Sequence, residues 1–179
     1  MSKSNRGFSL IEILVVIVII GILATLSVVL VANVIGKARD VKRKAELSQL
    51  GKFLTASCYT PDAGAGTYDL LDLINELKAK DERYKQLIGS NKFKDPKHSD
   101  ETHSNYTYVV TNDKKCALYA NLENDSEAVT LNNINMATPG AGNGVFASST
   151  VGINGSDRYF QVSNWLNWQI LSIMLLSNN

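Results

Sequence analysis

One residue near the start of the chain has a side chain that could do chemistry: Glu12, whose carboxylate lies four positions after Phe8. Glu12 opens a stretch in which residues 13–36 carry no charge. An ionised carboxylate beside so apolar a segment is costly unless it has a cationic partner or lies at a polar interface, so Glu12 is a candidate functional residue. The alternative is an interfacial acid that is favoured by the positive end of a helix.

The uncharged stretch has ILVVIVIIGILATLSVVLVA at its centre. As a helix this is long enough to cross a bilayer's hydrocarbon layer, which takes about 20 residues. Its length and its lack of turn residues favour a membrane-spanning helix over a buried strand or a buried soluble helix. Lys3 and Arg6 precede it without an acid. This order is typical of an export signal, but the run is longer than that of an ordinary signal peptide, and no small-x-small cleavage signature follows.

The segment RGFSLIEILVVIVIIGILA, residues 6–24, resembles the class III signal of type IV pilins and of the pseudopilins of type II secretion. The resemblance implies that a prepilin peptidase removes residues 1–7 by cutting between Gly7 and Phe8, and then methylates the new amine of Phe8. It also implies that Glu12 is the acid of the motif.

The resemblance gives Glu12 a partner, because cleavage creates a cationic amine at Phe8. In a filament the carboxylate of one subunit can meet the amine of a neighbour. An intrachain contact is the rival, since four helical steps span about 6 Å. Both charges lose water in such a pair, so its net energy is small, but a wrong stagger would leave a buried charge alone. We therefore expect Glu12 to set the register of assembly.

The fold implied by the resemblance is α+β and pilin-like, with a long N-terminal α-helix packed on a small antiparallel β-sheet. We expect residues 8–36 to be the apolar half of that helix, in the membrane first and in the filament core later. Residues 37–57 would be its outer, amphipathic half, and residues 58–179 a globular head with the sheet. A chain of 179 residues allows one long helix and one modest domain.

The outer half of the helix is expected to have two apolar faces. The larger residues suit packing on a sheet, and the smaller ones suit contact with other helices. The first face holds Leu47, Leu50, Leu54 and Cys58, and the second holds Val34, Ala38, Val41 and Ala45.

Five cations lie in the run GKARDVKRK: Lys37, Arg39, Lys42, Arg43 and Lys44. The positive-inside rule alone would place the head in the cytoplasm. Two features favour the opposite orientation. Cleavage needs the leader on the cytoplasmic side, and the cysteine pair prefers an oxidising compartment. The basic run then contacts anionic headgroups or acidic faces of neighbouring subunits, or it is a solvated helix face. The net charge of +1, or −1 without Lys3 and Arg6, demands no nucleic-acid partner.

The cysteines, Cys58 and Cys116, are even in number, which in an exported domain suggests a disulfide. The alternative is two unrelated buried thiols. If Cys58 faces the sheet, a cysteine on a strand could reach it.

The rest of the head is predicted from periodicity and turn residues. Residues 60–68 are expected to be a loop, 69–88 an amphipathic helix, and 89–105 a polar loop. Residues 105–111 and 116–122 form a predicted β-hairpin, with Tyr106, Tyr108 and Val110 on one face of its first strand. The partner strand presents Cys116, Leu118, Ala120 and Leu122. Further short strands are expected at 128–134, 144–147 and 158–162.

The end of the chain is strongly apolar from Trp165 to Leu176. About 12 residues are too few to span a bilayer. One interpretation is a last helix or strand that covers the sheet. The other is a contact with a subunit or partner.

No catalytic constellation can be named, and the protein is expected not to be an enzyme. His98 and His103 lie in a polar loop with Asp100 and Glu101, which makes a solvated loop a better interpretation than a zinc site. We expect no cofactor. The alternative is calcium, which some similar pseudopilins bind in an acidic loop; the loosely acidic segment here lacks EF-hand spacing and contains Asn121, Glu123, Asn124, Asp125 and Glu127.

The resemblance implies a prepilin, the structural subunit of a type IV pilus. Its partners would be copies of itself in a helical polymer, the prepilin peptidase, the assembly platform with its ATPase, and membrane lipid before assembly. It would be a single-pass cytoplasmic membrane protein first and a surface filament later. The alternatives are a pseudopilin of a type II secretion or DNA-uptake system, and a monomeric signal-anchored binding protein, which would leave the Phe8–Glu12 spacing unexplained.

Overall fold

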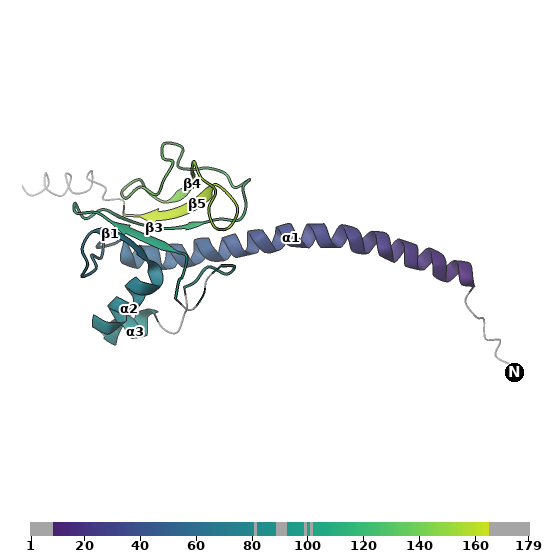
Figure 1. The fold of residues 1–179 in the computed structure, drawn as a ribbon, viewed down its shortest axis with the longest axis horizontal. Helices are drawn as coiled ribbons and strands as arrows, with labels where there is room; N and C mark the ends of the chain where they lie inside the picture. Colours follow the sequence, from purple (N-terminus) through teal and green to yellow (C-terminus); the bar gives the residue numbers. More distant parts are fainter. Residues whose placement is uncertain (1–8, 81, 89–92, 99, 101, 165–179) are drawn as a thin grey trace, which may run out of the picture. The chain divides into compact units, whose positions relative to one another are not determined.

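The computed structural model describes residues 9–80, 82–88, 93–98, 100 and 102–164, and within these it does not describe the side chains of residues 26–33, 83, 86 and 87. The chain forms two compact units, residues 1–38 and 39–179, and the first helix contributes to both (Figure 1). Gly7, Phe8 and the apolar segment 165–176 lie outside the described residues.

The first helix, α1, runs from Leu10 to Leu54 without a proline. It ends where Tyr59 donates its N–H to the Leu54 carbonyl at 3.3 Å and Cys58 takes a left-handed φ of 45°. This six-residue closing bond and left-handed residue are features of a Schellman motif, in which glycine usually holds the position of Cys58. The helix was expected to continue to about residue 57, and it is one turn shorter.

The head contains a five-stranded antiparallel sheet in the order β1-β2-β3-β5-β4. The strands are β1 (Gly66–Asp69), β2 (Thr107–Val110), β3 (Cys116–Asn121), β4 (Gly144–Ala147) and β5 (Arg158–Ser163). The expected α+β class, with a long N-terminal helix and an antiparallel sheet, is confirmed. The predicted hairpin is β2 and β3, in which Val110 pairs with Cys116 and Tyr108 with Leu118.

Three details differ from expectation. Residues 66–68 were expected in a loop and Asp69 at the start of a helix, but all four form the edge strand β1, in register with β2 from Gly66↔Val110 to Asp69↔Thr107. The single helix expected at 69–88 is two helices, α2 (Leu70–Lys80) and α3 (Glu82–Ile88). The strand expected at 128–134 is absent from that described segment, which meets β4 only at Val145: its carbonyl accepts the N–H groups of Thr130 and Leu131, and its N–H donates to the Thr130 hydroxyl.

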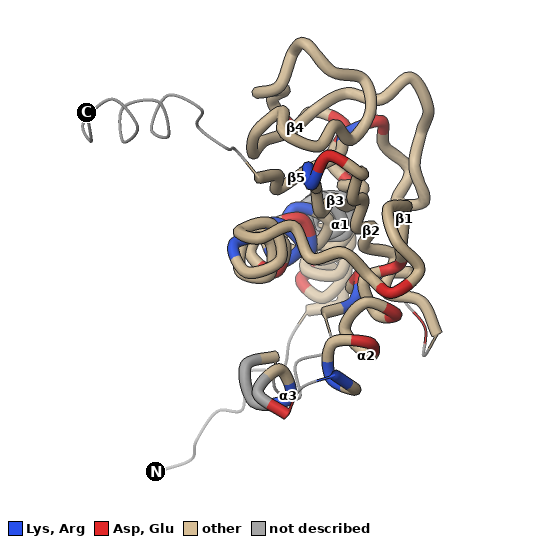
Figure 2. The backbone as a smooth tube through the Cα atoms, turned by 90° about the vertical axis from the view of Figure 1, so that its left-hand side faces the viewer, with Lys and Arg blue, Asp and Glu red and all other residues tan. Residues whose placement is uncertain are grey.

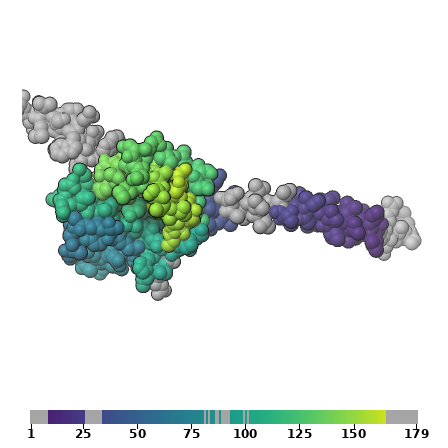
Figure 3. Space-filling view, turned by 45° about the horizontal axis from the view of Figure 1, so that its top comes forward, coloured from purple at the N-terminus to yellow at the C-terminus, as the bar shows by residue number. Residues whose placement is uncertain are grey.

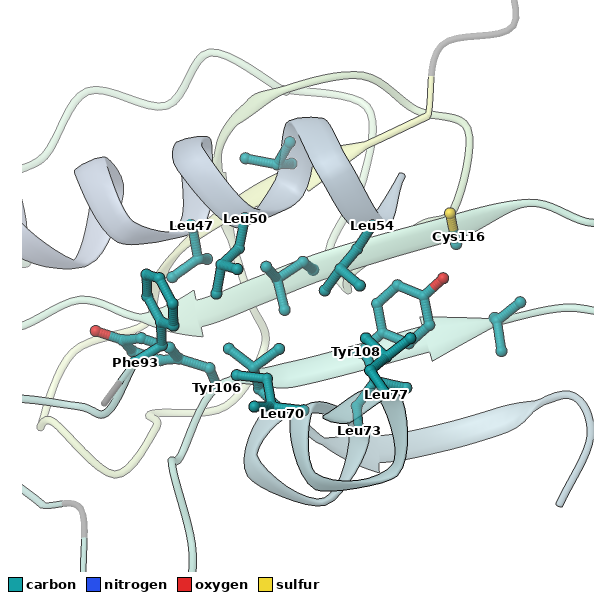
Figure 4. Packing of buried hydrophobic residues seen from close by; sticks show 14 of the residues in the cluster. Leu47, Leu50, Leu54, Leu70, Leu73, Leu77, Phe93, Tyr106, Tyr108 and Cys116 are labelled. Atoms are coloured by element: carbon teal, nitrogen blue, oxygen red, sulfur yellow. The ribbon is translucent and has the colours of Figure 1, made fainter. Parts of the chain in front are cut away.

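The core lies between α1, α2 and the sheet (Figure 4). The three leucines of the outer half of α1, Leu47, Leu50 and Leu54, are at most 5% exposed. Tyr106, Tyr108 and Leu118 meet them from the sheet region and are fully buried. The two buried tyrosines keep partners for their hydroxyls, since Tyr106 donates to Glu46 at 2.7 Å and Tyr108 to the Tyr59 carbonyl at 2.8 Å. The three leucines of the predicted sheet-facing stripe therefore enter the core, and its fourth member, Cys58, is buried but lies beyond the end of α1.

Helix α1 approaches β5 especially closely at Gly51. A Cβ placed on Gly51 would lie 2.4 Å from Val162 Cγ1 and 2.7 Å from its Cβ. Only the absence of a side chain lets the helix backbone pack against Val162 at this distance.

Candidate functional site

The first candidate site is the start of α1. Glu12 is in its first turn and is exposed, and the Ser9 carbonyl accepts the N–H groups of Glu12 and Ile13 at 3.1 and 3.3 Å. The carboxylate thus lies at the positive end of the helix, where a negative charge is favoured. Its proposed partner, the Phe8 amine, and the cleavage position at Gly7 fall outside the described residues. Of these three residues, the structure describes only Glu12.

Residues 10–23 of α1 present an apolar surface, which is purple in Figure 3. All the large apolar residues from Leu10 to Leu23 are between 47% and 84% exposed. A monomeric soluble protein rarely exposes an apolar surface this large without a partner for it. Within the described residues, no helix reaches the length and apolarity that a membrane crossing requires.

The small-residue face of α1 is exposed as well. Val34, Ala38, Val41 and Ala45 all lie at the surface, opposite the leucines that enter the core. The two faces predicted for the outer half of the helix are therefore present, one used by the head and one uncovered.

Part of the basic run of α1 is not the solvated or partner-facing surface that was expected, although Lys37 and Lys42 are exposed. Arg43 is fully buried and makes a two-point contact with Asp95, at 2.7 Å from Nε to Oδ2 and 3.0 Å from Nη2 to Oδ1. Its Nη1 donates to Asp40 at 2.7 Å and to Glu123 at 2.8 Å, and its Nη2 to Asn154 at 3.2 Å. The planar guanidinium suits this bidentate geometry, which a lysine could not reproduce.

Other cations of the same run bind the loop that follows β3. Arg39 pairs with Glu123 through Nε at 2.7 Å, and Lys44 pairs with Glu127. Asp40 accepts the backbone N–H groups of Glu123 and Asn124, both at 2.9 Å. Basic and acidic positions accordingly lie together around α1 (Figure 2). We call the side chains of Arg39, Asp40, Arg43, Asp95, Glu123 and Asn154 the helix-base network.

The network changes how its members ionise. Burial opposes the charge on Arg43, but the hydrogen bonds that it donates to Asp95 and Glu123 outweigh this effect and raise the pKa of the guanidinium. Burial would likewise raise the pKa of Asp95, and the hydrogen bonds from Arg43 and Asn154 instead lower it to about 2. The hydrogen bond from Arg39 lowers the pKa of Glu123 to about 2 as well. All these groups are therefore charged at neutral pH, and each buried charge has a partner.

The disulfide fixes the other end of the outer half of α1. Cys58 and Cys116 are bonded, with their Cα atoms 5.5 Å apart, and join the end of the helix to the first residue of the central strand β3. The bond closes a sequence separation of 58 residues. The helix-base network and the disulfide thus hold the helix on the sheet from two places.

Sequence reasoning missed the network because its members are far apart in the chain. Asp95 was assigned to a polar loop, although it is only 1% exposed. Asp40 and Arg43, three residues apart on one helix face, were the one local sign of an internal ion pair.

The metal candidates that the structure describes have other partners or are exposed, and Glu101 lies outside the described residues. Glu123 and Glu127, from the segment weighed for calcium, bind Arg39 and Lys44 instead. His98 and His103 are exposed, and His103 lies 3.5 Å from Asp100. Among the described residues, no group of three His, Cys, Asp or Glu side chains could hold a metal ion.

Comparison with known proteins gives one match. Residues 2–28 match the family model described as the prokaryotic N-terminal methylation motif. No curated protein and no solved structure matches the chain. The matched residues include Gly7, Phe8 and Glu12 and extend into the exposed apolar part of α1.

Proposed function

We propose that this chain, a pilin-type precursor by the N-terminal methylation motif at residues 2–28, is the structural subunit of a type IV pilus. The motif is the class III signal of type IV pilins and pseudopilins, and it marks a structural precursor rather than an enzyme. It carries the proposal, because it implies processing by a prepilin peptidase and assembly into a pilus-type polymer.

Processing would occur between Gly7 and Phe8. Hydrolysis of that peptide bond releases residues 1–7 and leaves a free amine on Phe8, which the same peptidase methylates. A methylated secondary amine is still protonated at neutral pH and retains a positive charge. The proposal is supported by the position of both residues inside the matched motif.

Glu12 would then select the register of assembly. Its carboxylate is exposed in the first turn of α1, surrounded on the helix by Ile11, Ile13 and other exposed apolar residues. In a bundle of such helices, the Phe8 amine of a neighbouring subunit is the cation that would neutralise it. A stagger that separated the two charges would leave both in apolar surroundings, which is costly.

The apolar half of α1 would exchange lipid for neighbouring helices. Before assembly, residues 8–36 would anchor the precursor in the cytoplasmic membrane with the head outside. After assembly they would form the filament core, so their apolar side chains stay out of water throughout. The uncovered face with Ala38, Val41 and Ala45 would continue this helix–helix contact into the outer half. The assembly platform and its ATPase would supply the work of extraction.

The proposal is tested on the surface material of cells that produce the protein. Shearing should release long filaments that are visible by electron microscopy and that bind an antibody against the head. They should disappear when the prepilin peptidase gene is deleted. A pseudopilin carries the same motif and is the alternative. It would be favoured if filaments were short or absent and if deleting the gene for this protein abolished secretion or DNA uptake.

A further inference from the structure

The sheet carries a groove on the face that looks away from α1. Its volume is about 380 Å³, and it is lined by residues of β1, β2, β3 and β5 with neighbouring loops. The register places Thr107 beside Tyr119, whereas the alternate residues Tyr108 and Leu118 are buried in the core under α1. Side chains alternate between the faces of a sheet, so Thr67, Thr107, Tyr119 and Tyr159 lie on the opposite face. No residue of α1 contributes to it.

Two tyrosine rings form adjoining walls of this groove. The rings of Tyr119 and Tyr159 have centroids 6.3 Å apart and planes tilted by 56°. Phe146 stacks on Tyr159 at 5.4 Å and 14°, which fixes the orientation of that ring. A Cβ at Gly152 would lie 2.4 Å from the Tyr159 hydroxyl, so the loop backbone closes on the ring from another side. These aromatic surfaces are held in place without any ligand.

The groove also offers hydroxyl groups that the protein does not use. The hydroxyls of Thr67, Thr107, Tyr119 and Tyr159 make no hydrogen bond to any residue that the structure describes, and all four line the groove. Asn105 donates its amide to the His98 carbonyl at 2.7 Å, and its side-chain oxygen accepts no hydrogen bond from the described residues. Each hydroxyl can both donate and accept, so the groove presents several polar contacts of either kind.

Charge in the groove is confined to one lining residue. Asp69 is the one charged residue among those lining it. Its carboxylate accepts the N–H of Leu71 at 2.8 Å, of Ser104 at 3.0 Å and of Asn105 at 3.1 Å. A phosphate-bearing ligand would need Lys or Arg, which this lining lacks. Because backbone N–H groups already occupy the Asp69 carboxylate and no cation lines the groove, the lining favours an uncharged ligand over an anionic one.

We propose that the groove binds a neutral saccharide. A sugar ring combines an apolar C–H face, which can lie on Tyr119 or Tyr159, with hydroxyls that match Thr67, Thr107 and Asn105. The volume is within the range of small-molecule sites. The proposal concerns the head alone and does not depend on whether the chain assembles.

The test is saturation-transfer NMR on the full chain in a detergent without a sugar headgroup. The probes are maltotriose, cellotriose, chitotriose and lactose, with 3′-sialyllactose as a charged comparison. At least one neutral probe should bind the wild type. The variant Tyr119→Ala should raise its Kd by at least about tenfold. Tyr119→Phe and Thr107→Val, which each remove one hydroxyl, should raise it by about fivefold.

The control is Tyr84→Phe, which removes a tyrosine hydroxyl on α3, beside Phe53 of α1 and away from the groove. It should bind the probe as the wild type does. Variants are compared only if they retain the cooperative unfolding of the wild type, and Thr107→Val remains informative if Tyr119→Ala does not fold. Failure of every neutral probe to bind, a preference for the sialylated probe, or equal affinity of Tyr119→Ala would overturn the proposal.

Discussion

The guanidinium of Arg43 and the carboxylate of Asp95 meet in a two-point contact, at 2.7 and 3.0 Å, although they are 52 residues apart in the chain. Neither side chain is more than 1% exposed. This contact brings a loop of the head onto the outer half of the first helix. Because the charges are buried, the pair is sensitive to the loss of either member.

We predict that Arg43→Met destabilises the head by about 3–5 kcal/mol, because Asp40 and Asp95 would remain buried without their cation. The matched control is Lys42→Met, the next position on the same helix, whose side chain is 58% exposed and pairs with Glu46 at 3.6 Å. That change should cost less than about 1 kcal/mol. Chemical denaturation of the full chain in detergent, followed by near-ultraviolet circular dichroism, measures both. Equal losses would show that the buried pair contributes no more than a surface pair.

Acid should weaken the head within a defined range. The pKa of Asp95 falls from its ordinary 3.8 to about 2 in the folded protein, so the unfolded chain binds its proton more readily. The stabilisation that Asp95 contributes is fully present above its pKa in the unfolded chain, and it is lost as the pH falls from about 4 to about 2. The pKa of Glu123 is lowered in the same direction. Unfolding free energies at pH 5, 4, 3 and 2 should therefore decrease steeply. The variant Asp95→Asn should be less stable at pH 5 and show a shallower decrease; an unchanged slope would contradict this assignment.

The disulfide between Cys58 and Cys116 should be measurable by mass. Alkylation of the unfolded protein without reductant should add no label, and after reduction it should add two. Identical labelling in both conditions would exclude the bond. Closing a separation of 58 residues is worth up to about 4 kcal/mol in a chain-entropy account, so the Cys58→Ser, Cys116→Ser double variant should be less stable by about 2–4 kcal/mol.

Glu12 is expected to act in assembly and not in processing. Glu12→Gln keeps the size of the side chain and removes its charge, so the precursor should still be cleaved but should form few filaments. Thr25→Val is the matched control, since it also removes a polar group from an exposed position of the same helix. Immunoblots separate precursor from mature chain, and sheared fractions report filaments. Normal filament yield with Glu12→Gln would end the proposed role in register.

Local patterns were sufficient to predict much of this fold. Leucines at helical spacing placed Leu47, Leu50 and Leu54 in the core, and alternation with turn residues located the hairpin and the strands near 144–147 and 158–162. The motif around Glu12 was equally local, and its family match agrees with it. These features depend on neighbours within a few residues, which is where periodicity carries information.

The features that were missed depend on distant partners. β1 is four residues long and begins with glycine, so only its pairing with β2 makes it a strand. Arg43 has the same sequence context as Lys42, but its partners Asp95 and Glu123 lie 52 and 80 positions away. The groove likewise combines Thr67, Tyr119 and Tyr159 from three strands. No short stretch of the sequence contains the residues that these features bring together.

Processing after Gly7 and assembly into filaments can be tested together by the intact mass and N-terminal sequence of protein from sheared surface material. We expect a chain that starts at a methylated Phe8 and is recovered as filaments. A chain that still starts at Met1 and is found only in membranes would contradict this expectation, and Glu12 would then be an interfacial acid at the start of a membrane anchor.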